Sequence, residues 1–348
     1  MRFLFSKALV YLQKKSTKTF FAYFLSIIFI YFLFFPNIYK YHWAFWESDV
    51  ETKHFPTREY LRNTIVEEKR FPFWTEKVFL GFPIYADLEN AYLNIPNFLS
   101  ILVFGPMTSF KITHLLTYLV GSFSFYFLLK KFKAGMYGSI AAVLVYYFSY
   151  FHLNHLIHYN MISISMLLPL NILLVQLFLD TKNKKYVLFQ SLILAYGLYW
   201  GHPQTTILVF IGICFYVFVF GADQKLKQKI QYLVFSLLIA ICLFLPQLIP
   251  SSKLFFQSLR SSEISSTQGS LTPELSISYA FPYIFSTWSY YYGKEAGNHF
   301  SYTELYNYVG IGALTILVVY LLKAKRNKLF WYSYFLFWIF SKVSKVQK

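Results

Sequence analysis

Long apolar runs alternate along this chain with short segments that carry its charges. Eight of the runs approach the roughly 20 residues that a helix needs to cross the hydrocarbon layer of a membrane. They lie at residues 19–36, 112–129, 134–151, 161–179, 186–200, 203–221, 230–249 and 305–322. A ninth run, at 329–341, is shorter. Because backbone polar groups within lipid must be satisfied internally, the pattern predicts an all-α polytopic membrane bundle of eight or nine spans.

Composition supports this reading. Of the 348 residues, 57% are hydrophobic and only 14% are charged, against roughly 25% charged in soluble domains. The net charge of +17 would suit a nucleic-acid partner, but the charges sit in clusters between apolar runs, which argues against one. Both cysteines fall inside apolar runs, so no disulfide framework is expected. The first run is too long for a signal-peptide core and is interpreted as an uncleaved span.

The distribution of basic residues predicts the topology. Most of the Lys and Arg residues fall in five segments that would lie on one side of the membrane, 1–18, 130–133, 182–185, 225–229 and 323–328. Only Asp180 and Asp223 accompany them, and the other acids lie in the intervening segments. Cytoplasmic loops carry an excess of Lys and Arg, so the N-terminus is predicted to be cytoplasmic.

This topology divides the chain into five parts. They are the N-terminus with the first span (1–36), a long outer segment (37–111), six spans (112–249), a second outer segment (250–304) and one or two final spans with a tail (305–348). Short amphipathic helices are expected in the first outer segment. All the histidines fall on the outer side or at an outer span end: His42, His54, His114, His152, His155, His158, His202 and His299. Long loops rich in polar and aromatic groups commonly carry function, so the outer face is the predicted working face.

Two acidic segments of the first outer loop are candidates for chemistry. Asp49 lies in Trp46-Glu47-Ser48-Asp49-Val50-Glu51, shortly after the first span. Its carboxylate could act as a general base or bind a cation, or it could be an ordinary solvated loop acid. Asp87 and Glu89 lie in an aromatic-rich stretch that leads to Asn-Ile-Pro-Asn at 94–97. Such aromatics stack on sugar rings, but they also anchor proteins at the membrane interface.

Histidines supply further candidates. His152, His155 and His158 recur at steps of three, a spacing that suits a metal site, polar interface residues or imidazoles that bind a phosphate head group. His202 and Gln204 lie in Gly-His-Pro-Gln at 201–204, where Pro203 suits the first turn of a helix. The open N–H groups of such a turn favour an anion such as a lipid phosphate, although an ordinary tight turn has the same sequence.

Arg260 follows the seventh span on the outer side and could hold a phosphate bidentately or form a surface salt bridge. The chain has no Walker motif, dinucleotide-binding glycine loop, nucleophile elbow or HExxH sequence. A nucleotide-fuelled pump is therefore excluded as an interpretation. An activated substrate would have to come from elsewhere, and the membrane is the nearest source.

These motifs, in this order, resemble the YfhO-type bacterial membrane proteins, a group within the GT-C glycosyltransferases. The resemblance runs from Trp46 to about Lys328. It rests on Asp49, on Gly81-Phe82-Pro83 with Asn94-Ile95-Pro96-Asn97, on Gly201-His202-Pro203-Gln204, on Leu245-Pro246-Gln247 with Ser258-Leu259-Arg260, and on Tyr308-Val309-Gly310-Ile311-Gly312. The Gly-His-Pro-Gln turn is the most specific of these motifs.

The resemblance implies an inverting transferase in the bacterial cell membrane. A transferase of this kind would move a sugar from a polyprenyl-phosphate donor to a cell-envelope glycan or polymer. Asp49 would be the general base, and His202 with Arg260 would hold the donor phosphate. The remaining expected substrate contacts are Asp87, Glu89, Gln204, His155 and His158. No specific cofactor is indicated; a divalent cation could bind Asp49 with Asp87 or Glu89, but no ligand spacing demands one.

Two alternative functions stay open. Members of the family are longer, so the resemblance implies a C-terminally shortened chain, which could be a non-catalytic membrane subunit or an inactive fragment. The other alternative is a transporter or flippase of lipid-linked sugars. Transporters usually place ionisable groups near the middle of their spans. The central parts of the spans here are almost free of charge, which favours the transferase.

Overall fold

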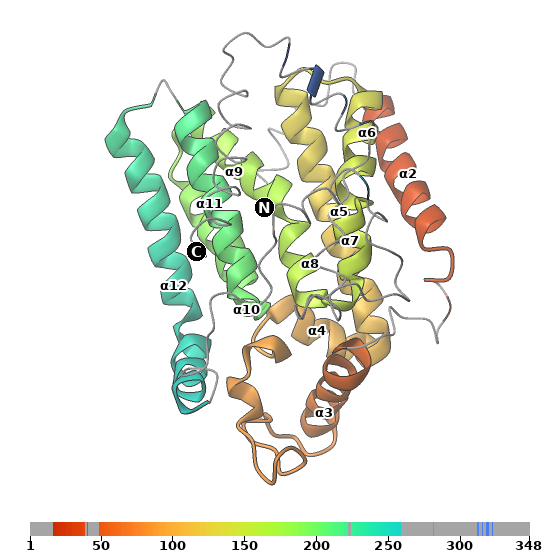
Figure 1. Cartoon of the computed structure of the whole chain (residues 1–348), viewed down its shortest axis with the longest axis vertical. Helices are drawn as coiled ribbons and strands as arrows, with labels where there is room; N and C mark the ends of the chain where they lie inside the picture. The colour runs from red at the N-terminus through yellow and green to blue at the C-terminus, as the bar shows by residue number, and fades with distance from the viewer. Residues whose placement is uncertain are drawn as a thin grey trace.

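The computed structural model describes residues 17–38, 40, 49–221 and 224–258, with single positions 281, 312, 315, 318, 319 and 322. Within these ranges the chain is a bundle of helices, and the short helices between Val50 and Phe104 form a smaller lobe at one end (Figure 1). The one strand-like pairing in this described part is a bridge between Thr75 and Phe82. The predicted all-α fold class is confirmed.

The helices include several of membrane-spanning length. Four segments are long and apolar enough to cross a membrane: α5 (Pro106–Lys131), α8 with α9 (Tyr159–Thr181), α11 (Pro203–Phe220) and α12 (Leu226–Gln257). A fifth span results if Met136–Tyr147 and Tyr150–Ile157, which bend by 43° at their junction, cross together. A multi-pass membrane protein is thus confirmed. The total of eight or nine spans stays a prediction.

Two of the expected spans are helical but short. The apolar part of α2 (Thr17–Phe34) is Lys18–Phe34. The 15 residues of α10 (Lys185–Tyr199) rise only about 22 Å at 1.5 Å per residue, against a hydrocarbon core of about 30 Å. The expected spans at 305–322 and 329–341 lie outside the described residues, isolated positions apart.

Proline marks where many helices begin. A proline occupies the first turn of five of them: α3 (Phe55–Val66), α4 (Ile95–Phe104), α5, α9 (Leu168–Thr181) and α11. The missing N–H costs nothing there, and the ring fixes a helical φ. Two consecutive helices meet at Gly105, whose φ of 81° lets α4 turn directly into α5. For this reason α5 begins at Pro106, earlier than the predicted start at 112.

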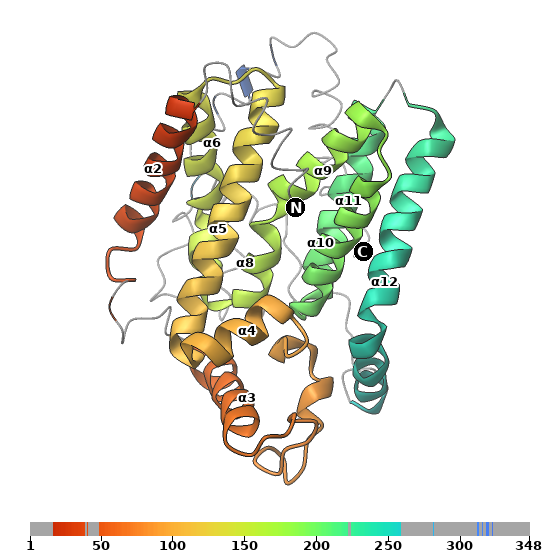
Figure 2. The ribbon, with the colours of Figure 1, turned by 180° about the vertical axis from the view of Figure 1, so that it is seen from behind.

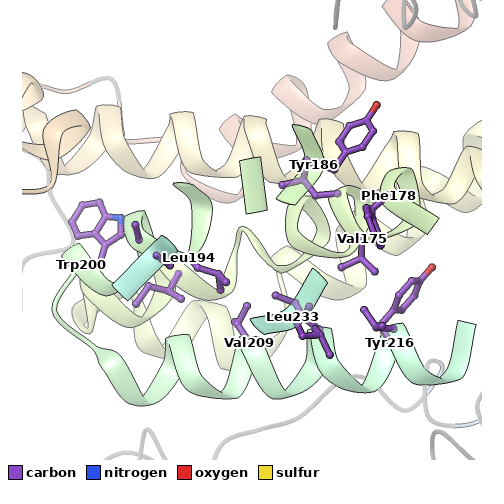
Figure 3. Close-up of a cluster of buried hydrophobic side chains, with 14 of the residues drawn as sticks. Val175, Phe178, Tyr186, Leu194, Trp200, Val209, Tyr216 and Leu233 are labelled. Carbon is purple, nitrogen blue, oxygen red and sulfur yellow. The ribbon is translucent and has the colours of Figure 1, made fainter. Parts of the chain in front are cut away.

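The bundle has two apolar cores. The larger joins α9, α10, α11 and α12; Val175, Leu194, Val209 and Leu233 lie close together there (Figure 3). The smaller joins α2, α5 and α6 (Met136–Tyr147) and is rich in tyrosine. Two of its tyrosine hydroxyls donate to backbone carbonyls of neighbouring helices, Tyr23 to Ser122 at 2.8 Å and Tyr118 to Ile27 at 2.9 Å. Buried tyrosines of this kind add directional bonds to apolar packing.

The short basic loops gather at one end of the bundle. Lys131 at the end of α5 pairs with Asp180 at the end of α9, with Nζ to Oδ2 at 2.7 Å. Gln224, between α11 and α12, donates to the carbonyl of Leu179 at 3.1 Å. The lobe that contains α3 and α4 lies at the opposite end, beside the C-terminal end of α12 (Figure 2). The helices therefore alternate in direction as the charge pattern requires, and assignment of the basic end to the cytoplasm stays a prediction.

The last described helix is longer than expected. α12 continues to Gln257, although the sequence pattern ended it at 249. Pro250 lacks the N–H that would bond the carbonyl of Pro246. The hydroxyl of Tyr85 donates to that carbonyl instead. A contact from the lobe thus replaces the bond that proline removes, and the helix passes through both prolines.

Within the lobe, α4 exposes apolar side chains and buries polar ones. Ile95, Leu99 and Val103 are 68%, 52% and 70% exposed, whereas Asn97 and Ser100 are buried. This polarity is the reverse of that expected for a helix on a water-soluble domain. It fits the expected short amphipathic helix of the outer segment, whose location in the membrane interface stays a prediction.

Candidate functional site

The lobe end of the bundle brings together four segments that lie far apart in the sequence. They contribute the outer cluster, which consists of Asp49, Lys53, Asp87, Glu89, His158 and His202. Lys53 Nζ bonds the Glu89 carboxylate and lies 3.3 Å from Asp87 Oδ2. Asp49 Oδ2 lies 3.8 Å from His158 Nε2. His202 follows Gly201, whose backbone packs against Leu88 and Glu89. Three predicted site residues are not part of this cluster: Gln204, His155 and Arg260, the last of which falls outside the described residues.

Asp49 is the accessible acid of the outer cluster. It occupies the N-cap position of η1 (Val50–His54), a short π-helical turn, without capping it through its side chain. The side chain is 51% exposed. The ring of its neighbour His158 has a buried Nδ1 without a hydrogen-bond partner among the described residues. A half-exposed carboxylate beside an imidazole can accept a proton from a hydroxyl that reaches it.

Lys53 ties the two other acids together. Burial acts to lower the pKa of Lys53, but the charges of Asp87 and Glu89 and the hydrogen bonds with them outweigh it, so the pKa is raised. For Glu89, burial acts to raise the pKa, but the hydrogen bond and the positive charge of Lys53 outweigh it, so the pKa is lowered. Asp87 also accepts the backbone N–H of Glu89 at 3.1 Å. Both acids are therefore paired with Lys53, whereas Asp49 is not.

Gly201 sets the distance between the Gly-His-Pro-Gln turn and the acid segment. A Cβ added at Gly201 would lie 2.0 Å from the carbonyl oxygen of Leu88 and 2.8 Å from the Cα of Glu89. Gly201 also has φ of +80°, which side chains disfavour. Asn160 holds the same stretch from another helix, donating to the Glu89 carbonyl at 2.8 Å. The turn therefore packs backbone to backbone against η3 (Leu88–Asn90).

The C-terminal part of α12 forms hydrogen bonds with the residues that precede Asp87 and Glu89. Gln247 Nε2 donates to the Tyr85 carbonyl at 2.8 Å, and Ser251 Oγ donates to the Ala86 carbonyl at 2.7 Å. With the bond from Tyr85 to Pro246, three contacts fix η2 (Ile84–Ala86) against α12. The Pro246-Gln247 pair singled out in the sequence thus positions the acid segment.

His202 caps the helix that it precedes. Its Nδ1 lies 2.8 Å from Thr205 Oγ1 and accepts from the Thr205 N–H at 3.4 Å. One of the open N–H groups expected at the start of α11 is therefore already satisfied. Gln204 is exposed in the first turn of the same helix. The expected phosphate ligands would act from this helix start through the His202 ring and the remaining N–H groups.

The Asn-Ile-Pro-Asn motif at 94–97 in the first outer segment has a structural role. Asn94 caps α4 by accepting the Asn97 N–H at 3.1 Å, and its amide donates to the Tyr196 carbonyl at 3.3 Å. Asn97 donates to the Ala91 carbonyl at 3.2 Å. These bonds join the lobe to α10, so the Asn-Ile-Pro-Asn sequence positions α4.

The three spaced histidines do not form one site. His152 is buried, with Nδ1 2.7 Å from the Tyr146 carbonyl oxygen and Nε2 3.2 Å from Ser165 Oγ. His155 bonds the Phe151 carbonyl at 2.8 Å, and its ring centre lies 5.3 Å from that of His158. The residues that the structure describes contain no group of three or more His, Cys, Asp or Glu side chains able to hold a metal. Of the three, His158 belongs to the outer cluster, and His155 is buried against its ring.

Two buried basic residues beside the outer cluster, His54 and Arg58, were not among the predicted site residues. Burial, with the charges of Arg58 and Lys53, lowers the pKa of His54 to about 3, so this imidazole is neutral at physiological pH. Burial lowers the pKa of Arg58 to about 10, and the guanidinium remains charged. It lies 3.6 Å from the ring centre of Phe110 and 4.7 Å from that of Tyr159, and donates to Ser109 Oγ at 2.7 Å. These contacts bind the lobe to α5.

The comparisons with known proteins add no family. No protein family model, curated protein or solved structure matches this chain. The resemblance to YfhO-type proteins therefore rests on its motifs and stays a prediction. What the structure adds is that four of the five motif groups, those within the described residues, meet or support one another at the lobe end.

Removing Lys53 is expected to weaken the lobe. In a Lys53→Gln variant the half-buried Glu89 carboxylate loses its charged partner, at a cost of about 1–2 kcal/mol. Thermal unfolding of the detergent-purified protein measures the effect. The matched control is Arg70→Gln, which breaks the exposed Arg70–Glu68 pair and should leave the unfolding temperature unchanged. Equal unfolding temperatures for the two variants would contradict a stabilising role for Lys53.

His54 predicts a loss of stability in acid. Its pKa is lowered in the folded protein, to about 3, against about 6.5 when unfolded. Between these values only the unfolded chain binds the proton, so the free energy of unfolding falls as pH is lowered, by about 1.4 kcal/mol per pH unit. A His54→Gln variant lacks this contribution. Its unfolding temperature should therefore vary less than the wild type's between pH 6 and 4, and parallel curves would refute the assignment.

Proposed function

We propose that this protein is a glycosyltransferase of the bacterial cell membrane that acts on the outer face. It would move a sugar from a polyprenyl-phosphate donor to a cell-envelope glycan or polymer. The observation that carries the proposal is the outer cluster, in which Asp49, Glu89 and His202 come from separate motifs and meet at the bundle end away from the basic loops. A donor anchored in lipid would present its phosphate and sugar at this level of the membrane.

The proposed reaction is a single displacement. Asp49 takes the proton from the acceptor hydroxyl, whose oxygen then bonds the anomeric carbon of the donor sugar. The bond from that carbon to the phosphate oxygen breaks, and polyprenyl phosphate leaves with the electron pair. Attack opposite the leaving group inverts the configuration at the sugar carbon. The accepting carboxylate is half exposed and needs no rearrangement to receive a hydroxyl.

The other cluster residues have supporting roles in this proposal. His202 and Arg260 would offset the charge that develops on the leaving phosphate. His158 lies beside Asp49 and would contact the sugar or acceptor, as would Gln204. His155 is buried against the ring of His158 and would support its position. Asp87 and Glu89 are held by Lys53 and, with it, present a fixed polar wall to the substrate. Neither acid is available as a second base while that pairing lasts.

Transport of a lipid-linked sugar is less well supported. A transporter needs polar groups that offer a path near the middle of its spans. In the described spans the central polar groups pair with one another, as Gln190 does with Asn171 at 2.5 Å and with Tyr232 at 3.1 Å. These bonds join α9, α10 and α12. They offer no charged group to which a substrate could bind on its way between the two ends of the bundle.

The deciding experiment is envelope-glycan composition in a strain that lacks the protein. Deletion is expected to remove one sugar from the envelope, and plasmid-borne wild type should restore it. Analysis of the lipid fraction separates the alternatives, because loss of a transferase leaves the polyprenyl-phosphate sugar accumulated on the outer leaflet, whereas loss of a flippase leaves it inside. An unchanged glycan in the deletion strain would reject the proposal.

A further inference from the structure

A second candidate site lies at the basic end of the bundle, away from the outer cluster. There α9, α10 and α12 border a cavity of about 440 Å³, within the range of roughly 300–1,000 Å³ that small-molecule sites occupy. Its walls are mostly apolar and include Phe178, Leu188, Tyr232 and Phe235. The proposed transferase chemistry uses none of these residues.

The opening of the cavity carries positive charge. Lys182 and Lys184, from the loop between α9 and α10, line it together with Gln228 and Gln231 of α12. No Asp or Glu lines it. The nearest acid of this loop region, Asp180, is engaged with Lys131 at 2.7 Å and with Gln176 at 2.7 Å. Within the described part of the chain neither lining lysine pairs with a carboxylate, so their charge remains available.

The cavity opens toward the side of the bundle as well as toward its end. Leu188 and Phe235, on facing helices, are 51% and 52% exposed although both are apolar. On a spanning helix such side chains face acyl chains. The side chains of α12 that line the cavity, from Gln228 and Gln231 to Phe235 and Ile239, follow one face of the helix and change from polar to apolar along it. This gradient matches a molecule with a polar head and an apolar tail.

We propose that this cavity is a binding site for an anionic phospholipid. The two lysines and two glutamines would hold the phosphate-bearing head group, and the apolar walls would take part of one acyl chain. Basic cavities between helices on the cytoplasmic side favour anionic lipids by charge, and a zwitterionic lipid offers the same tail without the net charge. The site is independent of the outer cluster and of the reaction proposed there.

The test uses the full chain purified in mild detergent. Native mass spectrometry would compare retention of phosphatidylglycerol and phosphatidylcholine with identical acyl chains. The wild type is expected to retain phosphatidylglycerol preferentially. A Lys182→Gln, Lys184→Gln double variant should lose about 30-fold in that preference, since each lysine near an anionic lipid surface contributes about fivefold. Both side chains are exposed, so folding should be unaffected.

Two matched variants separate charge from shape. Lys130→Gln with Lys133→Gln removes the same charge from the same end but outside the cavity, and retention should stay within about twofold of wild type. Val187→Phe fills the cavity without changing charge, and it should lower retention of both lipids. Equal retention of the two lipids by the wild type, or an unchanged preference in the Lys182, Lys184 double variant, would overturn the proposal.

Discussion

Replacing Asp49 by asparagine is expected to lower sugar transfer by about 10²- to 10⁴-fold, the usual contribution of a general base. Asparagine keeps the size and polarity of the side chain but cannot accept the proton. The protein should insert and fold normally, because the side chain is 51% exposed and its ionic neighbour among the described residues, His158 Nε2, is 3.8 Å away. Transfer from a synthetic polyprenyl-phosphate sugar, assayed with protein in lipid vesicles, measures the loss.

The matched control lies two residues along the same helical turn. Glu51 is exposed and is the second residue of η1, the turn that Asp49 precedes. Glu51→Gln removes one negative charge from the same turn and should leave transfer within about twofold of wild type. If both variants transfer normally, Asp49 is not the base. If both fail, the loss reflects the net charge of this turn, and the single-base mechanism fails with it.

The helical part of this fold was predictable because it follows from two strong signals. Apolar runs of near-spanning length marked the cores of α5, α9, α11 and α12, and the spacing of basic clusters marked which helix ends lie together. Helix boundaries were less predictable. Pro250 predicted the end of α12, but a hydroxyl from Tyr85, far away in the sequence, takes the carbonyl that the proline leaves open. No local pattern could reveal that bond.

The candidate site was predictable in its acids and less so in its architecture. The sequence singled out Asp49, Glu89 and His202, and the structure brings them into one cluster. Lys53 was missed, since its partners follow 34 and 36 residues later. Arg58 gave no signal, because a charge within a mixed helix such as α3 usually faces water. Its burial depends on aromatic rings supplied by α5 and α8.

The spacing of the histidines shows the limit of periodic patterns. His152, His155 and His158 would share one helix face only if the helix were continuous. The structure interrupts it, because α7 (Tyr150–Asn154) ends and η4 (His155–Ile157) follows. His152 then bonds within the bundle while His158 reaches Asp49. A three-residue repeat therefore grouped side chains that serve separate purposes.

Substituting Gly201 by alanine is expected to have the largest effect on the lobe. The added Cβ would lie 2.0 Å from the Leu88 carbonyl oxygen and 2.4 Å from its carbon. Both are backbone atoms, so no side-chain rotation relieves the clash. The left-handed φ of +80° adds strain. Separation of η3 from the turn would displace Glu89 and its bond from Asn160, and we expect a loss of about 3 kcal/mol or more, with loss of sugar transfer.

Gly212 provides the control for the same added methyl group. It lies within α11, the helix that follows Gly201, and a Cβ there meets no atom within 4 Å. Gly212→Ala should leave the unfolding temperature unchanged or raise it, because alanine favours helix over glycine by up to about 1 kcal/mol. Unfolding in detergent and transfer in vesicles should therefore separate the two variants sharply. A Gly201→Ala protein as stable as Gly212→Ala would mean that the turn and the acid segment do not touch, and the outer cluster would lose its structural basis.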